Sequence, residues 1–321
     1  MKKRTPSPVP GSPDWIEQRR HGIFATDAAT VLGINPFASR FEKYAELQGT
    51  TMPKVPTESM EMGVILQPVV GALWAKKHER KVRANPWTYW YEDGIGSHFD
   101  FDVVPPKGEP VTEIVEVKTA DKFAAKDWGE QGSSEVPESY EAQCFHEMMC
   151  RGPQIVRCHL AVLIGGNRYR DYVIERDDEA IGYLVTVERR FLANSLAGIA
   201  PEMDGSEAAT EYLRRISPHD DASRWELPEP VEALATAYLA ASASMKSAEE
   251  QKASAANLIR AAMGDHALAT GRSLKVSYKN NKDSDRIDWK ALVRSLPPGA
   301  LVPFTTIEPG ARPLIVTYIG D

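Results

Sequence analysis

Residues 113–119 constrain the fold of this chain most, because their polar and apolar side chains alternate as they do in a β-strand. At this period Glu116 and Lys118 project from one face, and the valines between them enter the core on the other. A second β-rich stretch, residues 96–104, comes before it. Residues 105–110 join the two, and their prolines and glycine are typical of a hairpin connection. The pattern predicts two paired strands.

This pairing would place an aspartate of the earlier strand beside Glu116 and Lys118. Two carboxylates and an amine at one sheet edge bind a hard divalent cation and polarise a water against a phosphodiester. In most strands, two charged residues around a valine are only a solvated face. The hypothesis of a hydrolytic site therefore depends on the rest of the chain.

The composition is that of an ordinary soluble globular protein, with 321 residues, 42% hydrophobic and 26% charged. We expect one large domain with an appendage, or two domains. No apolar run reaches the length of a membrane span and the N-terminus lacks a signal-peptide pattern, so we expect a cytoplasmic protein without a membrane partner. Three cysteines are too few for a four-thiolate iron–sulfur cluster and odd for a disulfide framework, which predicts reduced thiols.

The net charge of −7 is mildly adverse to a nucleic-acid partner, since phosphate neutralisation supplies most of the affinity for DNA. The positive residues are clustered, however, and a bound metal ion would add charge where a phosphate sits. The clusters are Arg19 and Arg20, Lys76 to Arg83, Lys118 to Lys126, and Lys275 to Lys282.

The order of predicted elements indicates an α/β (α+β) domain with a central mixed sheet flanked by helices. Helices are expected over residues 14–22, 26–33, 40–48, 58–80, 139–151 and 178–196, and strands over 82–92, 96–104, 112–119, 155–164 and 169–176. The three strands over 82–119 are predicted as a meander, and the last two as a hairpin.

The domains are predicted at 1–13, 14–216 and 217–321. The first is a proline-rich flexible tail, the second holds the candidate site, and the third is an extension with a small β element. Within the extension, residues 229–263 are alanine-rich and repeat apolar residues every seven positions, which predicts a long helix or a helical hairpin. We expect a packing arm or an oligomer contact there, followed by strands over 274–278 and 314–318.

Six motifs in order resemble the YqaJ-like viral recombinase family, whose nucleases are of the PD-(D/E)XK type. They are Trp15 and Arg19 with Gly22 to Gly33, the helix Gly63 to Val70, Ser97 to Asp100, Val115 to Lys118, Trp128-Gly129 with Val136-Pro137, and Tyr140 to His146. The resemblance implies a restriction-endonuclease-like core that digests duplex DNA from its ends, 5′ to 3′, with Mg²⁺ or, in its place, Mn²⁺. It also implies a phage or prophage protein, a homo-oligomeric ring and a single-strand annealing protein as partner.

Carried over residue by residue, the resemblance implies that Asp100, Glu116 and the Val117 carbonyl bind the metal. Lys118 would orient the attacking water or offset charge on the phosphate. Gln143 would hydrogen-bond the water or a metal-bound oxygen.

Three further assignments concern DNA ends and reserve ligands. Arg19 and Thr26 match positions that grip a terminal 5′ phosphate, with Arg19 making a forked contact. Asp102 shares the strand face of Asp100 and is a reserve metal ligand.

The chain departs from the family pattern at the site itself. Phe101 follows Asp100 in place of glycine, and His98 with Phe99 replaces a small residue and proline, with His98 expected in an exposed loop. Gln67 stands where the family has a metal-holding glutamate, and its amide brings no charge. Besides the exonuclease, the sequence therefore leaves open a structure-specific endonuclease and a catalytically weak protein that binds DNA ends and recruits an annealing partner.

Overall fold

The computed structural model describes residues 3–50, 57–217, 219–283, 288–297, 299–306 and 313–318. Contacts divide the chain into two compact units, Met1–Ser217 and Pro218–Asp321, next to the boundary that the composition indicates. Among the described residues, no helix is both long and apolar enough to cross a membrane.

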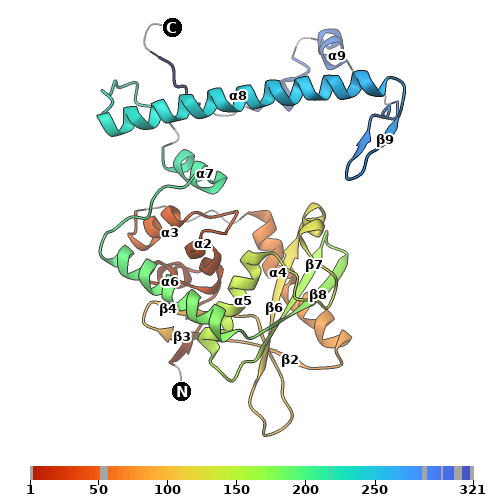
Figure 1. Ribbon diagram of the computed structural model, residues 1–321. Coiled ribbons are helices and arrows are strands. Elements are labelled where there is room, and N and C mark those ends of the chain that lie inside the picture. Colours follow the sequence, from red (N-terminus) through yellow and green to blue (C-terminus); the bar gives the residue numbers. More distant parts are fainter. Residues whose placement is uncertain are drawn as a thin grey trace. The chain divides into compact units, whose positions relative to one another are not determined.

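The first unit is built on a five-stranded mixed sheet (Figure 1). Its order is β2 (Val82–Ala84), β5 (Phe101–Val103), β6 (Glu113–Ala120), β7 (Arg157–Ile164) and β8 (Arg168–Glu175). Only the β6–β7 pair is parallel within this sheet, and β7 and β8 form the predicted hairpin. The prediction of a mixed α/β architecture with a central sheet is confirmed.

Helices cover both faces of this sheet. α5 (Glu138–Arg151) and α6 (Asp178–Leu196) pack on one face, where Ile114, Leu160 and Tyr172 meet Met148 and Ile181. α4 (Glu58–Lys77) packs on the other face, where the buried side chains are Val70, Trp74, Val115, Val117 and Ala161. The alternation along β6 therefore separates two buried layers, and Glu116 is 4% exposed instead of lying on a solvated face.

A second sheet, in the order β1-β3-β4, replaces the predicted meander. β1 (Arg4–Pro6) pairs with β3 (Trp87–Glu92), which pairs with β4 (Ile95–Ser97). Pro86, which has no N–H to donate, separates β3 from β2, so the two stretches join different sheets. The prediction of a flexible tail over residues 1–13 is wrong for Arg4–Pro6, because these residues pair with β3 as a strand.

Short helices complete this unit. α1 (Pro13–Arg20) is followed by the 3₁₀ turn η1 (Ala25–Asp27) and by α2 (Ala28–Leu32), which ends at Gly33 with φ of 80°. α3 (Arg40–Leu47) follows, the 3₁₀ turn η2 (Lys122–Asp127) comes after β6, and α7 (Glu207–Ile216) packs Tyr212 near Phe41. These elements confirm the predicted helices near residues 14–22 and 40–48.

The second unit contains one continuous helix of 35 residues, α8 (Glu229–Met263), so the predicted hairpin alternative is wrong. The antiparallel strands β9 (Leu268–Thr270) and β10 (Lys275–Ser277) follow, then α9 (Trp289–Ser295) and the 3₁₀ turn η3 (Val302–Phe304). The strand predicted over 314–318 is absent from the described residues, because β-branched side chains form a strand only where another strand pairs with them.

Gly71 of α4 lies against the Phe101 ring, and a Cβ added there would stand 2.7 Å from a ring carbon. We expect Gly71→Ala to lower the free energy of unfolding by about 1–3 kcal/mol, because the overpacking outweighs the helix preference for alanine. Denaturant titration measures this change.

Gly182→Ala in α6 is the matched control, since nothing lies within 4 Å of its added Cβ. This control should gain roughly 0.5–1 kcal/mol. Equal gains in both variants would contradict the close contact between α4 and β5.

Candidate active site

Asp100 lies where the chain passes from the small sheet to the central one. β4 ends at Ser97, and β5 begins at Phe101. Because the antiparallel register sets Phe101 opposite Val115, Asp100 is level with Glu116 on the neighbouring strand. The hairpin predicted from the sequence thus brings these two carboxylates to one edge.

The backbone of β6 holds the Asp100 side chain in place. β5 is shorter than β6, so the N–H of Val117 has no partner on β5 and donates to Asp100 Oδ2 at 2.8 Å. Within a strand, the carbonyl of a residue lies on the same edge as its N–H, so the Val117 carbonyl also faces this side. Gln67 of α4 donates from Nε2 to Asp100 Oδ1 at 2.6 Å. Both oxygens of Asp100 are therefore held.

Glu116, Lys118 and Gln143 form a closed triangle of hydrogen bonds. Lys118 Nζ donates to Glu116 Oε1 and to Gln143 Oε1, both at 2.8 Å. Gln143 of α5 donates back from Nε2 to Glu116 Oε1 at 2.5 Å. Gln143 and Glu116 are buried, and 17% of the Lys118 side chain is exposed. The structure thus brings together three residues that the sequence analysis assigned to one site.

Burial and the nearby Glu116 carboxylate raise the pKa of Asp100 well above its ordinary value, although Lys118 and the Val117 N–H oppose them. Burial disfavours the charged form of Lys118, but the attraction of Glu116 overrides it and raises the Lys118 pKa. The cluster therefore contains a firmly charged amine and, at Asp100, a carboxyl group whose ionisation is disfavoured.

Glu147 belongs to this cluster and was missed by the sequence analysis. Its Oε1 accepts from Gln143 Nε2 at 2.8 Å, whereas its Oε2 has no hydrogen-bond partner among the described residues. Burial, and then the charge of Glu116, raises the pKa of Glu147 well above its ordinary value. The available signal was its position four residues after Gln143, which puts both on one face of α5.

Asp102, the predicted reserve metal ligand, forms ion pairs with two arginines. Its Oδ2 lies 3.2 Å from Arg83, the residue opposite it on β2, and its Oδ1 lies 3.4 Å from Arg151 at the end of α5. The side chain is buried between them. The structure thus gives Asp102 an ion-pairing role between β2, β5 and α5, because two guanidinium groups already neutralise it.

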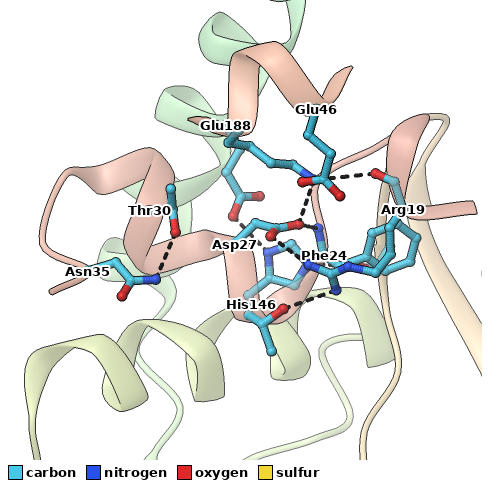
Figure 2. A network of polar contacts seen from close by, with 11 residues as sticks. Arg19, Phe24, Asp27, Thr30, Asn35, Glu46, His146 and Glu188 are labelled. Carbon is cyan, nitrogen blue, oxygen red and sulfur yellow. Dashed lines mark hydrogen bonds and ion pairs between the residues drawn. The ribbon is translucent and has the colours of Figure 1, made fainter. Parts of the chain in front are cut away.

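Arg19 lies beside Thr26 and Asp27, and Figure 2 shows Arg19 next to Asp27. Arg19 Nη1 donates to Thr26 Oγ1 at 3.0 Å, and Nη2 pairs with Asp27 at 2.7 Å. Lys43 lies 3.0 Å from the other Asp27 oxygen and is almost completely buried. Burial opposes ionisation of Asp27, but Arg19 and Lys43 overcome it and lower its pKa.

The partners Asp27 and Lys43 were not predicted. Asp27 also accepts the N–H of Phe24 at 2.9 Å, and Lys43 pairs with Glu46 at 3.0 Å (Figure 2). The Arg19 guanidinium lies 4.9 Å from the centroid of the Trp15 ring. The ion pair with Asp27 and the contact with Trp15 therefore hold the Arg19 side chain in place, with 14% of it exposed.

His98 is not the exposed loop residue that the sequence predicted. Its ring stacks on Phe24 with 5.0 Å between centroids, and its Nε2 lies 2.7 Å from Gln18 Oε1. Burial, aided by the Arg19 charge, lowers the pKa of His98 to about 4. His98 is thus a neutral packing partner behind Arg19 at physiological pH.

His146, the last residue of the motif that begins at Tyr140, links α5 to neighbouring elements. Its Nδ1 lies 2.7 Å from Glu188 of α6, and its Nε2 lies 2.9 Å from the Gly96 carbonyl (Figure 2). Both ring nitrogens face acceptors, so both carry protons. Burial opposes this charge, but Glu188 raises the His146 pKa well above its ordinary value. This buried pair joins α5 to α6 and β4.

The donor set fits a hard cation. No group of three or more His, Cys, Asp or Glu side chains in the described part of the chain is arranged to hold a metal ion. The edge instead offers the carboxylates of Asp100 and Glu116, the Val117 carbonyl and the Gln67 amide, all of which supply oxygen ligands. Burial, and then the charge of Glu116, raises the pKa of Asp100, and a cation bound at this edge would favour its charged form.

Comparison with known proteins shows what part of the first unit is similar to. The profile of the YqaJ-like viral recombinase domain matches residues 14–154. The uncharacterized protein YqaJ of Bacillus subtilis (strain 168) is 32% identical over 206 residues, which make up 63% of this chain and 62% of the relative. The chain thus spans less than two thirds of that relative's length. These matches confirm the resemblance drawn from the six motifs.

Two solved structures align with part of the chain. The alkaline exonuclease LHK-Exo from Laribacter hongkongensis has 20% sequence identity and a TM-score of 0.46, covering 64% of this chain and 98% of that one. A phage related exonuclease from Haemophilus somnus 129PT has 11% identity and a TM-score of 0.42, covering 56% and 97%.

The raised pKa of Asp100 makes the stability of the fold depend on pH. An unfolded aspartate ionises near 3.8, whereas Asp100 keeps its proton to higher pH in the fold. The unfolded state then binds fewer protons, so this group lowers stability as pH rises above that value. Asp100→Asn removes the effect, and its stability relative to the native chain should grow by roughly 1.4 kcal/mol per pH unit until Asp100 ionises.

Denaturation with chelator present, from pH 4 upward, measures this difference. The control is Asp93→Asn, which changes an aspartate whose side chain is 94% exposed. A constant difference between Asp100→Asn and the native chain at all pH values would show that Asp100 ionises normally.

Proposed function

Residues 14–154 form a YqaJ-like viral recombinase domain, and from this premise we propose that the chain is a Mg²⁺-dependent DNA exonuclease of phage-type recombination. It would digest linear duplex DNA from the 5′ end by hydrolysing phosphodiester bonds. The observation that supports this proposal most is the convergence of Asp100, Glu116, Lys118 and Gln143 at one edge of the sheet.

Asp100, Glu116 and the Val117 carbonyl would hold the cation, with Gln67 as a neutral fourth ligand. A bound Mg²⁺ would supply Lewis-acid polarisation of the scissile phosphate and would acidify an attacking water. The chain's own contribution is to fix the carboxylates: the Val117 N–H and the Gln67 amide hold Asp100, and Gln143 holds Glu116.

Lys118 would offset the negative charge that builds on the phosphate during attack. Its raised pKa keeps it protonated, so it acts as a cation and a hydrogen-bond donor and not as a base. Gln143 accepts from Lys118 and so fixes the direction of the ammonium group. Gln143 is in turn held by Glu147, which makes Glu147 a positioning residue.

Arg19 and Thr26 would bind the terminal 5′ phosphate of the DNA. Arg19 is oriented by Asp27 and stacked near Trp15, so little side-chain entropy is lost on binding. The partly exposed guanidinium keeps donors for an anion, because an arginine has five N–H groups and the structure engages one each with Thr26 and Asp27.

Gln67 favours a second candidate, a protein that binds DNA ends but cuts them weakly. An amide at this position adds no negative charge for a metal ion. In the structure the Gln67 Nε2 donates to Asp100 instead. A chain of this kind would hold DNA ends for a single-strand annealing partner. The two candidates differ in whether Mg²⁺ produces turnover.

Incubation with linear and with covalently closed circular duplex tests the exonuclease directly. We expect Mg²⁺-dependent loss of the linear DNA only, and cutting of the circle would instead favour a structure-specific endonuclease. Lys118→Met should slow digestion by roughly 10²–10³ through loss of one charge-stabilising donor. Lys107→Met, which removes an exposed lysine of the connection between β5 and β6, should digest at the native rate. Native activity in Lys118→Met would remove the proposed role of Lys118.

Gln67→Glu should lower the Mg²⁺ concentration for half-maximal digestion by roughly tenfold, because it adds a carboxylate to the site. Without Mg²⁺ the same variant should be less stable, since the introduced carboxylate would face Asp100 in place of the amide that now donates to it. Digestion rates across a Mg²⁺ titration at pH 8 provide the measurement.

The charge-matched control is Val64→Glu, at an exposed position of the same helix. It should leave the Mg²⁺ requirement unchanged. Absence of Mg²⁺-dependent digestion in both the native chain and Gln67→Glu would favour the end-binding protein.

A further inference from the structure

α8 carries a row of apolar residues that the second unit leaves exposed. The row repeats at seven-residue spacing, with one set at Val231, Tyr238, Met245, Lys252 and Ile259, and a second set at Leu234, Ala241, Ala248, Ala255 and Ala262. We call these ten positions the α8 seam. Leu234 is 69% exposed and Met245 is 64% exposed, although α8 is fully described and only its last residue, Met263, is buried.

The spacing of the α8 seam specifies the kind of partner. A repeat of 3.5 residues per turn keeps a narrow apolar stripe facing another helix along its whole length, as in a coiled coil. α8 is about 52 Å long at 1.5 Å per residue. No other described helix of the second unit approaches this length, since α9 has 7 residues. A helix that covers the seam along its length must therefore come from another chain.

We propose that the α8 seam pairs with the seam of a second copy of this chain in an antiparallel coiled coil. In this register a residue of the first set faces one of the second set: Val231 faces Ala262, Leu234 faces Ile259, Tyr238 faces Ala255, Ala241 faces Lys252, and Met245 faces Ala248. Most layers then combine a large side chain with an alanine, which is how close-packed layers fill space evenly.

A parallel pair of the same helices packs poorly. It would place Tyr238 against Tyr238 and Ala241 against Ala241, so wide layers alternate with empty ones. It would also bring Lys252 against Lys252 inside the seam, where two like charges repel and are desolvated. In the antiparallel pair Lys252 faces Ala241, which leaves room for its ammonium group to reach water.

Charge along α8 favours the same direction. Glu229 and Glu232 lie in the first turn and Arg260 lies in the last turn, whereas Glu249 and Glu250 offset Lys246 and Lys252 between them. Antiparallel pairing sets the acidic first turn of one helix beside Arg260 of its partner, and it also opposes the two helix dipoles favourably.

Sedimentation of the full chain tests the interface. Met245→Glu puts a carboxylate into both central layers and should reduce the native mass by about half, as expected for loss of a two-fold contact. Ala243→Glu adds the same charge two positions away on the opposite, exposed side of the helix, and should keep the native mass. Equal masses for the native chain and Met245→Glu would overturn the proposal, and circular dichroism shows whether both variants remain helical.

Disulfide trapping tests the direction and needs no disruptive change. Oxidation of a mixture of Leu234→Cys and Ile259→Cys chains should give a cross-linked heterodimer, because these positions face each other in the antiparallel register. The three native cysteines are buried, so the unsubstituted chain serves as the control. Efficient cross-linking of Leu234→Cys to itself would establish a parallel pair. The absence of any cross-link, or a seam occupied only by a different protein, would exclude pairing of two copies.

Discussion

The hydrogen bond from the Val117 N–H to Asp100 is the contact on which the candidate site depends. β5 is too short to pair with all of β6, and the carboxylate of Asp100 satisfies the backbone group that β5 leaves open. An unsatisfied N–H at this depth would be costly. The same bond places the carboxylate level with Glu116, so a single side chain completes the sheet and belongs to the candidate site.

Around this bond, α5 organises the remaining groups. It presents Gln143 to Glu116 and Lys118, supports Gln143 with Glu147, and is itself anchored by the His146–Glu188 pair. Buried hydrogen bonds of this kind rigidify a site, although one oxygen each of Glu147 and Glu188 has no partner among the described residues. The motif Tyr140 to His146 thus combines a residue of the site with a residue that holds the helix.

The two units contribute different physical features. The first unit concentrates buried charge, which suits phosphodiester chemistry, and the second presents a largely uncharged seam on a long helix, which suits self-association. Antiparallel pairing through α8 would join two copies of the first unit in one particle. Two linked sites would raise the local concentration of one site near DNA already held by the other.

Local patterns in the sequence determined most helices and the β5–β6 hairpin, which sets an aspartate beside Glu116 and Lys118, because periodicity and strand register act over short distances. The choice of Asp100 and the addition of Gln143 came from the order of the motifs and not from a local pattern. Tertiary structure decided the rest. It buried the charged face of β6 under α5, placed Asp102 between two arginines and Asp27 beneath Arg19, and joined Arg4–Pro6 to β3. These outcomes depend on contacts between residues far apart in the chain, and no local pattern encodes which distant partner will neutralise a charge or pair with a strand.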